Sequence, residues 1–168
     1  MIKPNDIIDI NLQPGDFYFG GPATRIRTLL GSCIAITLWH PQRLIGGMCH
    51  YMLPRRASRH EPLQGKYADE AMELFIQQAR SHKTHLKEYQ IKVFGGGNMF
   101  PEYTLRHRHS VSEKNIAAAQ QLLAQHHVTP LSQDVGLTGH RNIIFEVWSG
   151  NVWVRYQSQT KTITKNKL

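Results

Sequence analysis

Two neighbouring apolar runs constrain the fold of this chain more than any other feature. Residues 33–39, "CIAITLW", and residues 44–53, "LIGGMCHYML", are rich in the β-branched and apolar residues typical of strands. Only a few residues separate them, including a proline, so we expect the runs to pair as an antiparallel hairpin. Gly46–Gly47 in the second run predicts a bulge or a close approach of two backbones.

The rest of the chain adds helices and further strands. Residues 65–83 repeat apolar side chains every four positions, which predicts a helix with one buried face. A strand over 90–96 ends in a triple glycine, and a second helix covers about 112–126, with Ser110 or Ser112 as its N-cap. Residues 141–156 alternate as a hairpin turning at 149–151. This order of elements predicts a layered α+β domain with two main helices.

Length and composition limit the remaining possibilities. The chain has 168 residues, and we expect a single domain over 1–158 with a mobile, basic C-terminal tail over 159–168. A hydrophobic fraction of 40% excludes a disordered chain. No apolar run approaches the roughly 20 residues that span a bilayer, and the N-terminus lacks the apolar block of a signal peptide. We therefore expect a cytoplasmic protein without membrane insertion.

The charge balance points to acidic partners. The formal net charge is +8, which favours association with an acidic surface. The basic residues are spread over several segments, and no nucleic-acid-binding motif accompanies them, so we do not expect nucleic acid as a partner.

Cys33 could be a buried small side chain, a metal ligand or a nucleophile. If the hairpin turns at Pro41–Gln42, Cys33 falls directly opposite His50, with Cβ atoms about 4.5–5.5 Å apart on one face. An imidazole at that distance can take the thiol proton and so activate the cysteine. The same register places Cys49 opposite Ile34 on the other face, as a core residue that forms no disulfide. A slip of one residue would separate the pair, so a structural role for Cys33 stays open.

The segment before Cys33 offers further polar groups. Gly31–Ser32 forms a small-residue turn whose backbone amides can face the oxyanion of an acyl-transfer intermediate. Thr28 is the nearest polar side chain that could orient the imidazole, although it could equally cap the turn.

Metal and cofactor sites find little support in the sequence. The pairs His82/His85 and His107/His109 come without a second ligand pair at zinc spacing, so we expect no metal. The glycines at 95–97 lack the lysine and hydroxyl of a nucleotide loop, and a turn beside the active site is the better interpretation.

Five segments together resemble the chemoreceptor glutamine deamidases (CheD) of bacterial chemotaxis. They are 30–41, 45–54, 65–76, 92–100 and 134–156, and they include the Gly-Ser-Cys and Gly-Gly-Met-x-His blocks. The resemblance covers nearly the whole domain in the same order. It implies a layered α/β/β/α-type fold with mixed or antiparallel sheets, similar to deamidating bacterial toxins.

The resemblance also implies an activity and the residues that perform it. Cys33 would be the nucleophile and His50 the base, with Thr28 as the third catalytic residue. Some members carry the threonine one position earlier, where this chain has Arg27, so either position remains open. Gly31, Ser32 and Gly47 would contact the substrate.

The implied enzyme is a protein-glutamine glutaminase that needs no cofactor. It would convert glutamines of methyl-accepting chemotaxis receptors to glutamate through a cysteine thioester, with a chemotaxis phosphatase or adaptor as a further partner. Two alternatives remain: a cysteine-dependent hydrolase of another amide or ester, including receptor glutamyl methyl esters, or a non-catalytic partner of chemotaxis proteins.

Overall fold

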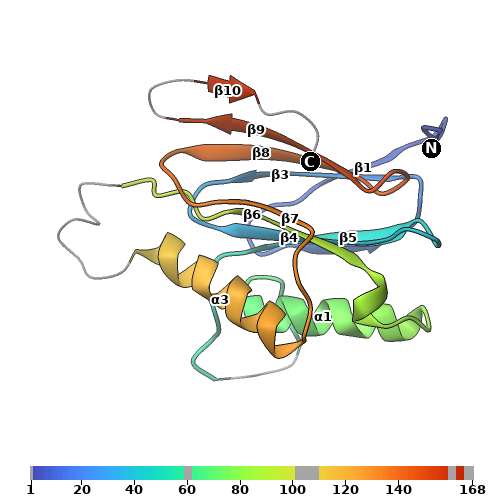
Figure 1. Ribbon diagram of the computed structural model, residues 1–168, viewed down its shortest axis with the longest axis horizontal. Coiled ribbons are helices and arrows are strands. Elements are labelled where there is room, and N and C mark those ends of the chain that lie inside the picture. Colours follow the sequence, from blue (N-terminus) through green and yellow to red (C-terminus); the bar gives the residue numbers. More distant parts are fainter. Residues whose placement is uncertain (1, 59–61, 101–109, 159–161, 165–168) are drawn as a thin grey trace.

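The computed structural model describes residues 2–58, 62–100, 110–158 and 162–164. These ranges contain two five-stranded sheets and two α-helices (Figure 1). Sheet A consists, in spatial order, of β1 (Ile8–Asn11), β3 (Thr24–Leu30), β8 (His140–Glu146), β9 (Asn151–Gln157) and β10 (Thr162–Thr164). Sheet B consists of β2 (Phe17–Gly20), β5 (Ile45–Tyr51), β4 (Ile34–His40), β6 (Gln90–Gly95) and β7 (Ser132–Val135). Each sheet is mixed, because β1 runs parallel to β3 and β6 runs parallel to β7.

The two sheets lie face to face, and α1 (Ala68–Ser81) and α3 (Val111–Gln125) cover the other side of sheet B (Figure 1). One core cluster fills the space between the sheets, and a second lies between sheet B and the helices. The expected α+β class, with two main helices and mixed or antiparallel sheets, is confirmed. The α/β/β/α-type order of layers differs, because among the described residues both helices cover sheet B. No helix in these ranges combines the length and the apolar character needed to cross a bilayer.

The helices form where the sequence predicts them: α1 is shorter than expected at both ends, and α3 begins and ends one residue earlier. In α1 the apolar residues at spacings of three and four, from Ala68 to Ala79, are buried against sheet B. In α3 the Ser110 hydroxyl accepts from the amide of Glu113 at 3.2 Å, and the Glu113 carboxylate accepts from the amide of Ser110 at 3.0 Å. Ser110, not Ser112, is therefore the N-cap, in a reciprocal capping box.

The turn of the first hairpin is longer than expected. β4 ends at His40 and β5 begins at Ile45, and the Leu44 amide donates to the His40 carbonyl at 2.9 Å. The prediction that Cys33 lies directly opposite His50 is therefore wrong by two residues, because Ala35 takes that position. Since side chains alternate along a strand, a shift of two keeps Cys33 and His50 on the same face.

The two glycines of this hairpin serve a close approach of backbones. The register runs through Gly46 and Gly47 without a bulge, so of the two expectations only the close approach holds. A Cβ on Gly46 would lie 2.4 Å from the Leu38 carbonyl oxygen, and one on Gly47 would lie 2.4 Å from that of Tyr18.

Several short strands were not predicted. β1, β2 and β7 have four residues each, which is too short for a clear alternation of apolar and polar residues. The seven-residue β3 was not predicted either. Within the tail expected at 159–168, the structure describes only Thr162–Thr164, which pairs with β9 as β10. The division between domain and tail stays a prediction.

Gly46→Ala should destabilise the fold strongly. The new methyl group would collide with backbone that cannot move without breaking the β4–β5 ladder, at a cost of about 2–3 kcal/mol. Urea unfolding measures the change. Gly21→Ala is the matched control, because no atom lies within 4 Å of the position that a Cβ would take there; equal losses for the two variants would contradict the packing argument.

Candidate active site

His50 lies between the two sheets, where its imidazole meets a hydroxyl from the opposite sheet. The side chain is 1% exposed, and Thr28 on β3 is 3% exposed. Thr28 Oγ1 lies 2.7 Å from His50 Nδ1 and also donates to the Leu12 carbonyl oxygen at 3.0 Å. A hydroxyl carries one proton, so Oγ1 can only accept from Nδ1–H. This places the proton on Nδ1 and leaves a lone pair on Nε2.

The second ring nitrogen of His50, Nε2, carries the free lone pair. Nε2 is buried without a hydrogen-bond partner in the described part of the chain. Burial lowers the pKa of His50 to about 4, although the negative charge of Asp16 acts in the opposite direction. The imidazole is therefore neutral at pH 7 and can accept a proton at Nε2.

Cys33 lies one residue before β4 and packs against the cluster between the sheets. It is partly exposed, and burial raises the pKa of its thiol, whereas a hydrogen bond from Ser32 lowers it. The position is diagonal to His50 across the hairpin, a relation in which residues are generally about 7–8 Å apart. The resting pair is thus a neutral thiol and a neutral imidazole that share one face.

A glycine-rich loop lies beside Cys33, as the sequence predicted, and it also holds the turn that carries this residue. Gly97 donates its amide to the Gly31 carbonyl and Gly96 donates to the Cys33 carbonyl, both at 2.8 Å. Gly95 passes so close that a Cβ there would lie 2.2 Å from the Cys33 oxygen, and its φ of 111° also favours glycine.

The backbone N–H groups of this turn are not bound by other backbone groups of the described residues. Within the described ranges, the amides of Ser32 and Cys33 make no backbone hydrogen bond. Two such amides beside a sulfur atom are suited to an oxyanion.

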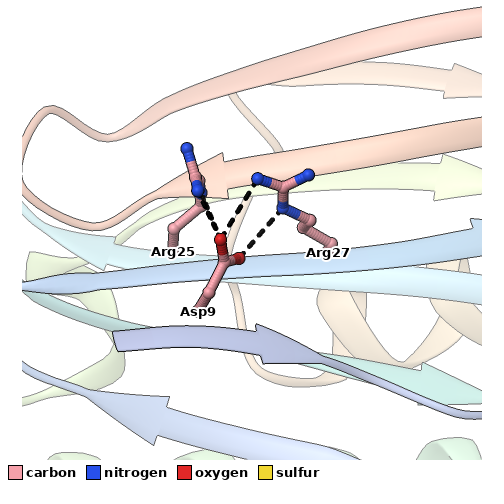
Figure 2. Close-up of polar contacts among 3 residues, drawn as sticks. All are labelled: Asp9, Arg25 and Arg27. Carbon is pink, nitrogen blue, oxygen red and sulfur yellow. Dashed lines mark hydrogen bonds and ion pairs between the residues drawn. The ribbon is translucent and has the colours of Figure 1, made fainter. Parts of the chain in front are cut away.

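Arg27 lies on the outer face of sheet A, away from His50. Figure 2 shows Arg25 and Arg27 converging on the Asp9 carboxylate; Arg27 Nε lies 2.9 Å from Oδ1 and Nη2 3.1 Å from Oδ2. The hydrogen bond from Arg25 is the main cause that lowers the pKa of Asp9. Because neighbours on a strand face opposite sides, Arg27 and Thr28 cannot both reach the imidazole. Of the two, Thr28 does so.

Gly47 and Cys49, for which the sequence predicted a substrate contact and a core position, lie away from the Cys33 turn. Gly47 is paired with Leu38 and Phe19 in the middle of sheet B, which indicates backbone packing rather than contact with a substrate at Cys33. Cys49 is fully buried on the helix side of sheet B, opposite Ile36 rather than Ile34, and burial raises its pKa to about 12.

Metal ligands do not gather in the described ranges. They contain no group of three or more His, Cys, Asp or Glu side chains that could hold an ion. His107 and His109 lie outside the described residues.

Comparison with known proteins identifies the family. The family model described as CheD chemotactic sensory transduction matches residues 52–156, more than half of the chain. The chain belongs to the CheD family. A "Probable chemoreceptor glutamine deamidase CheD" of Pseudomonas savastanoi pv. phaseolicola is 54% identical over 158 residues, covering 94% of this chain and 89% of that protein. A CheD of the same description from Pseudomonas fluorescens is 52% identical over the same shares. A CheD 1 from Leptospira interrogans is 40% identical, covering 95% of this chain and 99% of its own.

Sequence reasoning missed two residues beside this candidate site. Asp16, whose charge acts on His50, lies in a short loop without a motif. Asn115 is a fully buried amide on α3 that reaches the Cys33 turn. Its spacing of four and eight residues from Ala119 and Leu123, both on the buried face of the helix, was a detectable signal, since a polar residue in such a stripe is unusual.

The alkylation of Cys33 should depend steeply on pH. Because the thiol pKa is raised, the thiolate fraction and the reaction rate with iodoacetamide should rise about tenfold per pH unit between pH 6 and 8. Mass spectrometry of the labelled peptide gives the rate, and Cys33→Ser is the control for labelling at buried Cys49. A level rate over this range would indicate a preformed thiolate–imidazolium pair.

His50 should make the fold less stable at acidic pH. Between its unfolded pKa of about 6.5 and its folded pKa of about 4, the unfolded chain binds a proton that the folded chain does not. The free energy of unfolding is therefore unaffected by His50 above about pH 6.5 and decreases as the pH falls towards 4. At pH 5 the decrease is about 2 kcal/mol. Urea unfolding at pH 8 and pH 5 should show a smaller pH dependence for His50→Gln than for the wild type; equal dependence would contradict the assignment.

Proposed function

We propose that this protein is a protein-glutamine deamidase that converts glutamines of chemotaxis receptors to glutamate. The observation that carries the proposal is the Thr28–His50 hydrogen bond, which leaves a bare Nε2 on the face that Cys33 shares. Membership of the CheD family and the names of the curated relatives support the same substrate class.

The first half of the reaction would form a thioester. Nε2 of His50 takes the thiol proton as the Cys33 sulfur attacks the side-chain carbonyl carbon of the glutamine. The amides of Ser32 and Cys33 stabilise the resulting oxyanion. The imidazolium, whose low pKa makes it a strong acid, then gives its proton to the departing ammonia, and the thioester remains.

The second half would release the product. Water adds to the thioester carbon while Nε2 takes one of its protons. Collapse of this intermediate breaks the carbon–sulfur bond, the sulfur regains the proton, and the receptor side chain leaves as glutamate. Thr28 accepts from Nδ1–H throughout and so keeps the imidazole in the required tautomer.

The wider setting belongs to the same proposal. A net charge of +8 suits an enzyme that approaches an acidic protein surface. A cytoplasmic location, and a chemotaxis phosphatase or adaptor as a second partner, are supported by the resemblance to the family alone.

Incubation with a receptor cytoplasmic fragment should convert specific glutamines to glutamate, which mass spectrometry detects as a mass increase of about one dalton per site. Cys33→Ala should abolish conversion, because it removes the thiol that attacks the glutamine carbonyl. His50→Ala should lower the rate at least about 100-fold, as expected for loss of a general base. Conversion that survives in Cys33→Ala would reject the mechanism.

Substitutions at the third position separate its two candidates. Thr28→Val should lower kcat about 10- to 100-fold, because Nδ1–H loses its acceptor, whereas Thr28→Ser should retain most activity. Arg27→Ala is the matched control at the neighbouring residue and should leave kcat within about twofold.

The wild type also separates the alternative functions. If it converts no glutamine but releases methanol from receptor methyl esters, the esterase alternative is indicated. If it binds chemotaxis proteins without either reaction, the non-catalytic alternative is indicated.

A further inference from the structure

A fully buried amide connects the two segments that carry Cys33 and His50. The β4–β5 ladder ends at the pair Ile34 and Tyr51, so Cys33 lies beyond its last rung. At this point Asn115 of α3 inserts its side chain: Nδ2 donates to the Ser32 carbonyl at 3.2 Å and to the Met52 carbonyl at 2.8 Å. One carboxamide thereby replaces the next rung of the hairpin.

The position of this carboxamide is itself fixed. Asn115 is 0% exposed, and its backbone carbonyl accepts from the Tyr51 hydroxyl at 2.6 Å. The helix that carries it begins at the Ser110 capping box one turn earlier. The Tyr51 hydroxyl of β5 and the helix α3 therefore fix the backbone of Asn115, and its side chain binds the Cys33 turn.

The bonding pattern requires an amide at this position. Both acceptors are carbonyl oxygens, so the side chain must present N–H groups, and leucine or aspartate of similar shape offers none at neutral pH. Nδ2 satisfies both acceptors, while Oδ1 is buried without a hydrogen-bond partner in the part of the chain that the structure describes. A buried unpaired oxygen is unfavourable, so the bridge exists at a cost to the fold.

The bridge completes the fixation of the Cys33 turn. The glycine-rich loop binds the carbonyls of Gly31 and Cys33, and Asn115 binds the one between them. Three consecutive carbonyls are thus held, which fixes the orientation of the intervening peptide groups and of the amides of Ser32 and Cys33. Of the three side-chain and backbone donors, Asn115 alone also binds the Met52 carbonyl, directly after the strand that carries His50.

We propose that Asn115 is a positioning residue that sets the distance and orientation between the Cys33 turn and the His50 strand. This inference rests on the proposed function, because it assigns the consequence of that geometry to the rate of thioester formation. Asn115 acts through the backbone and does not touch the substrate. A displacement of about 1 Å between reacting groups can lower a rate about 100-fold.

The test is the deamidation kinetics of Asn115→Leu with the receptor fragment, at a temperature where circular dichroism shows a folded protein. We expect kcat to fall about 10- to 100-fold while KM stays within about twofold, because the substrate surface is unchanged. Ser112→Ala is the matched control. Ser112 is buried on the same helix and bonds to Ser110 Oγ at 2.8 Å, and its hydroxyl is not among the groups that bind the Ser32 and Met52 carbonyls in the described ranges. Its kcat should stay within about twofold.

A pH profile separates positioning from general loss of packing. In Asn115→Asp only the protonated acid can donate to a carbonyl, so kcat of the folded variant should rise as the pH falls, relative to the wild type at each pH. This variant also carries the test if Asn115→Leu does not fold. A kcat within twofold of the wild type for Asn115→Leu, an equal loss for Ser112→Ala, or an unchanged pH profile for Asn115→Asp would overturn the proposal.

Failure of the proposed function is recognised separately. If the wild type converts no receptor glutamine, that proposal fails, and Asn115 is then assessed by alkylation of Cys33 with iodoacetamide. A rate constant for Asn115→Leu at pH 7 that differs at least about threefold from the wild type supports positioning of the thiol relative to its base. Equal rate constants overturn it.

Discussion

The candidate site depends on a single proton, the one on the Thr28 hydroxyl. The hydroxyl donates that proton in a hydrogen bond to the Leu12 carbonyl, so Thr28 Oγ1 can only accept from His50. The tautomer of His50 follows from this without any further group. The interaction also crosses the gap between the two sheets. The packing of sheet A on sheet B therefore determines the chemistry of the imidazole, and the site cannot be understood from the Cys33–His50 hairpin alone.

The hairpin was the best-predicted part of the site and shows what a sequence pattern can supply. Alternation along the two runs predicted correctly that Cys33 and His50 share a face and that Cys49 lies on the other. The register was wrong by two because the turn contains four residues. Its last residue, Leu44, adopts a left-handed conformation, which a sequence normally signals by glycine or asparagine. Since the period of a strand is two, this error left the faces unchanged.

The contacts from outside the hairpin were harder to predict. Thr28 was a candidate only because it is near Cys33 in the sequence and because the chain resembles CheD. Its approach to His50 depends on the packing of one sheet against the other. Asn115 follows the Cys33 turn by more than 80 positions, and its role depends on how α3 docks against sheet B. Such contacts between distant segments are not encoded in local periodicity. The α+β class, by contrast, rests on local patterns, and it was predicted well.

The division of the site between two sheets separates the failure of the chemistry from the failure of the fold. Cys33 and His50 are joined by one hairpin and by Asn115, whereas Thr28 belongs to the facing layer. On heating, a small slip of one layer over the other would disconnect the imidazole from its acceptor while every strand keeps its ladder. The imidazole could then rotate or exchange tautomers, and the protein would be inactive yet fully structured by circular dichroism.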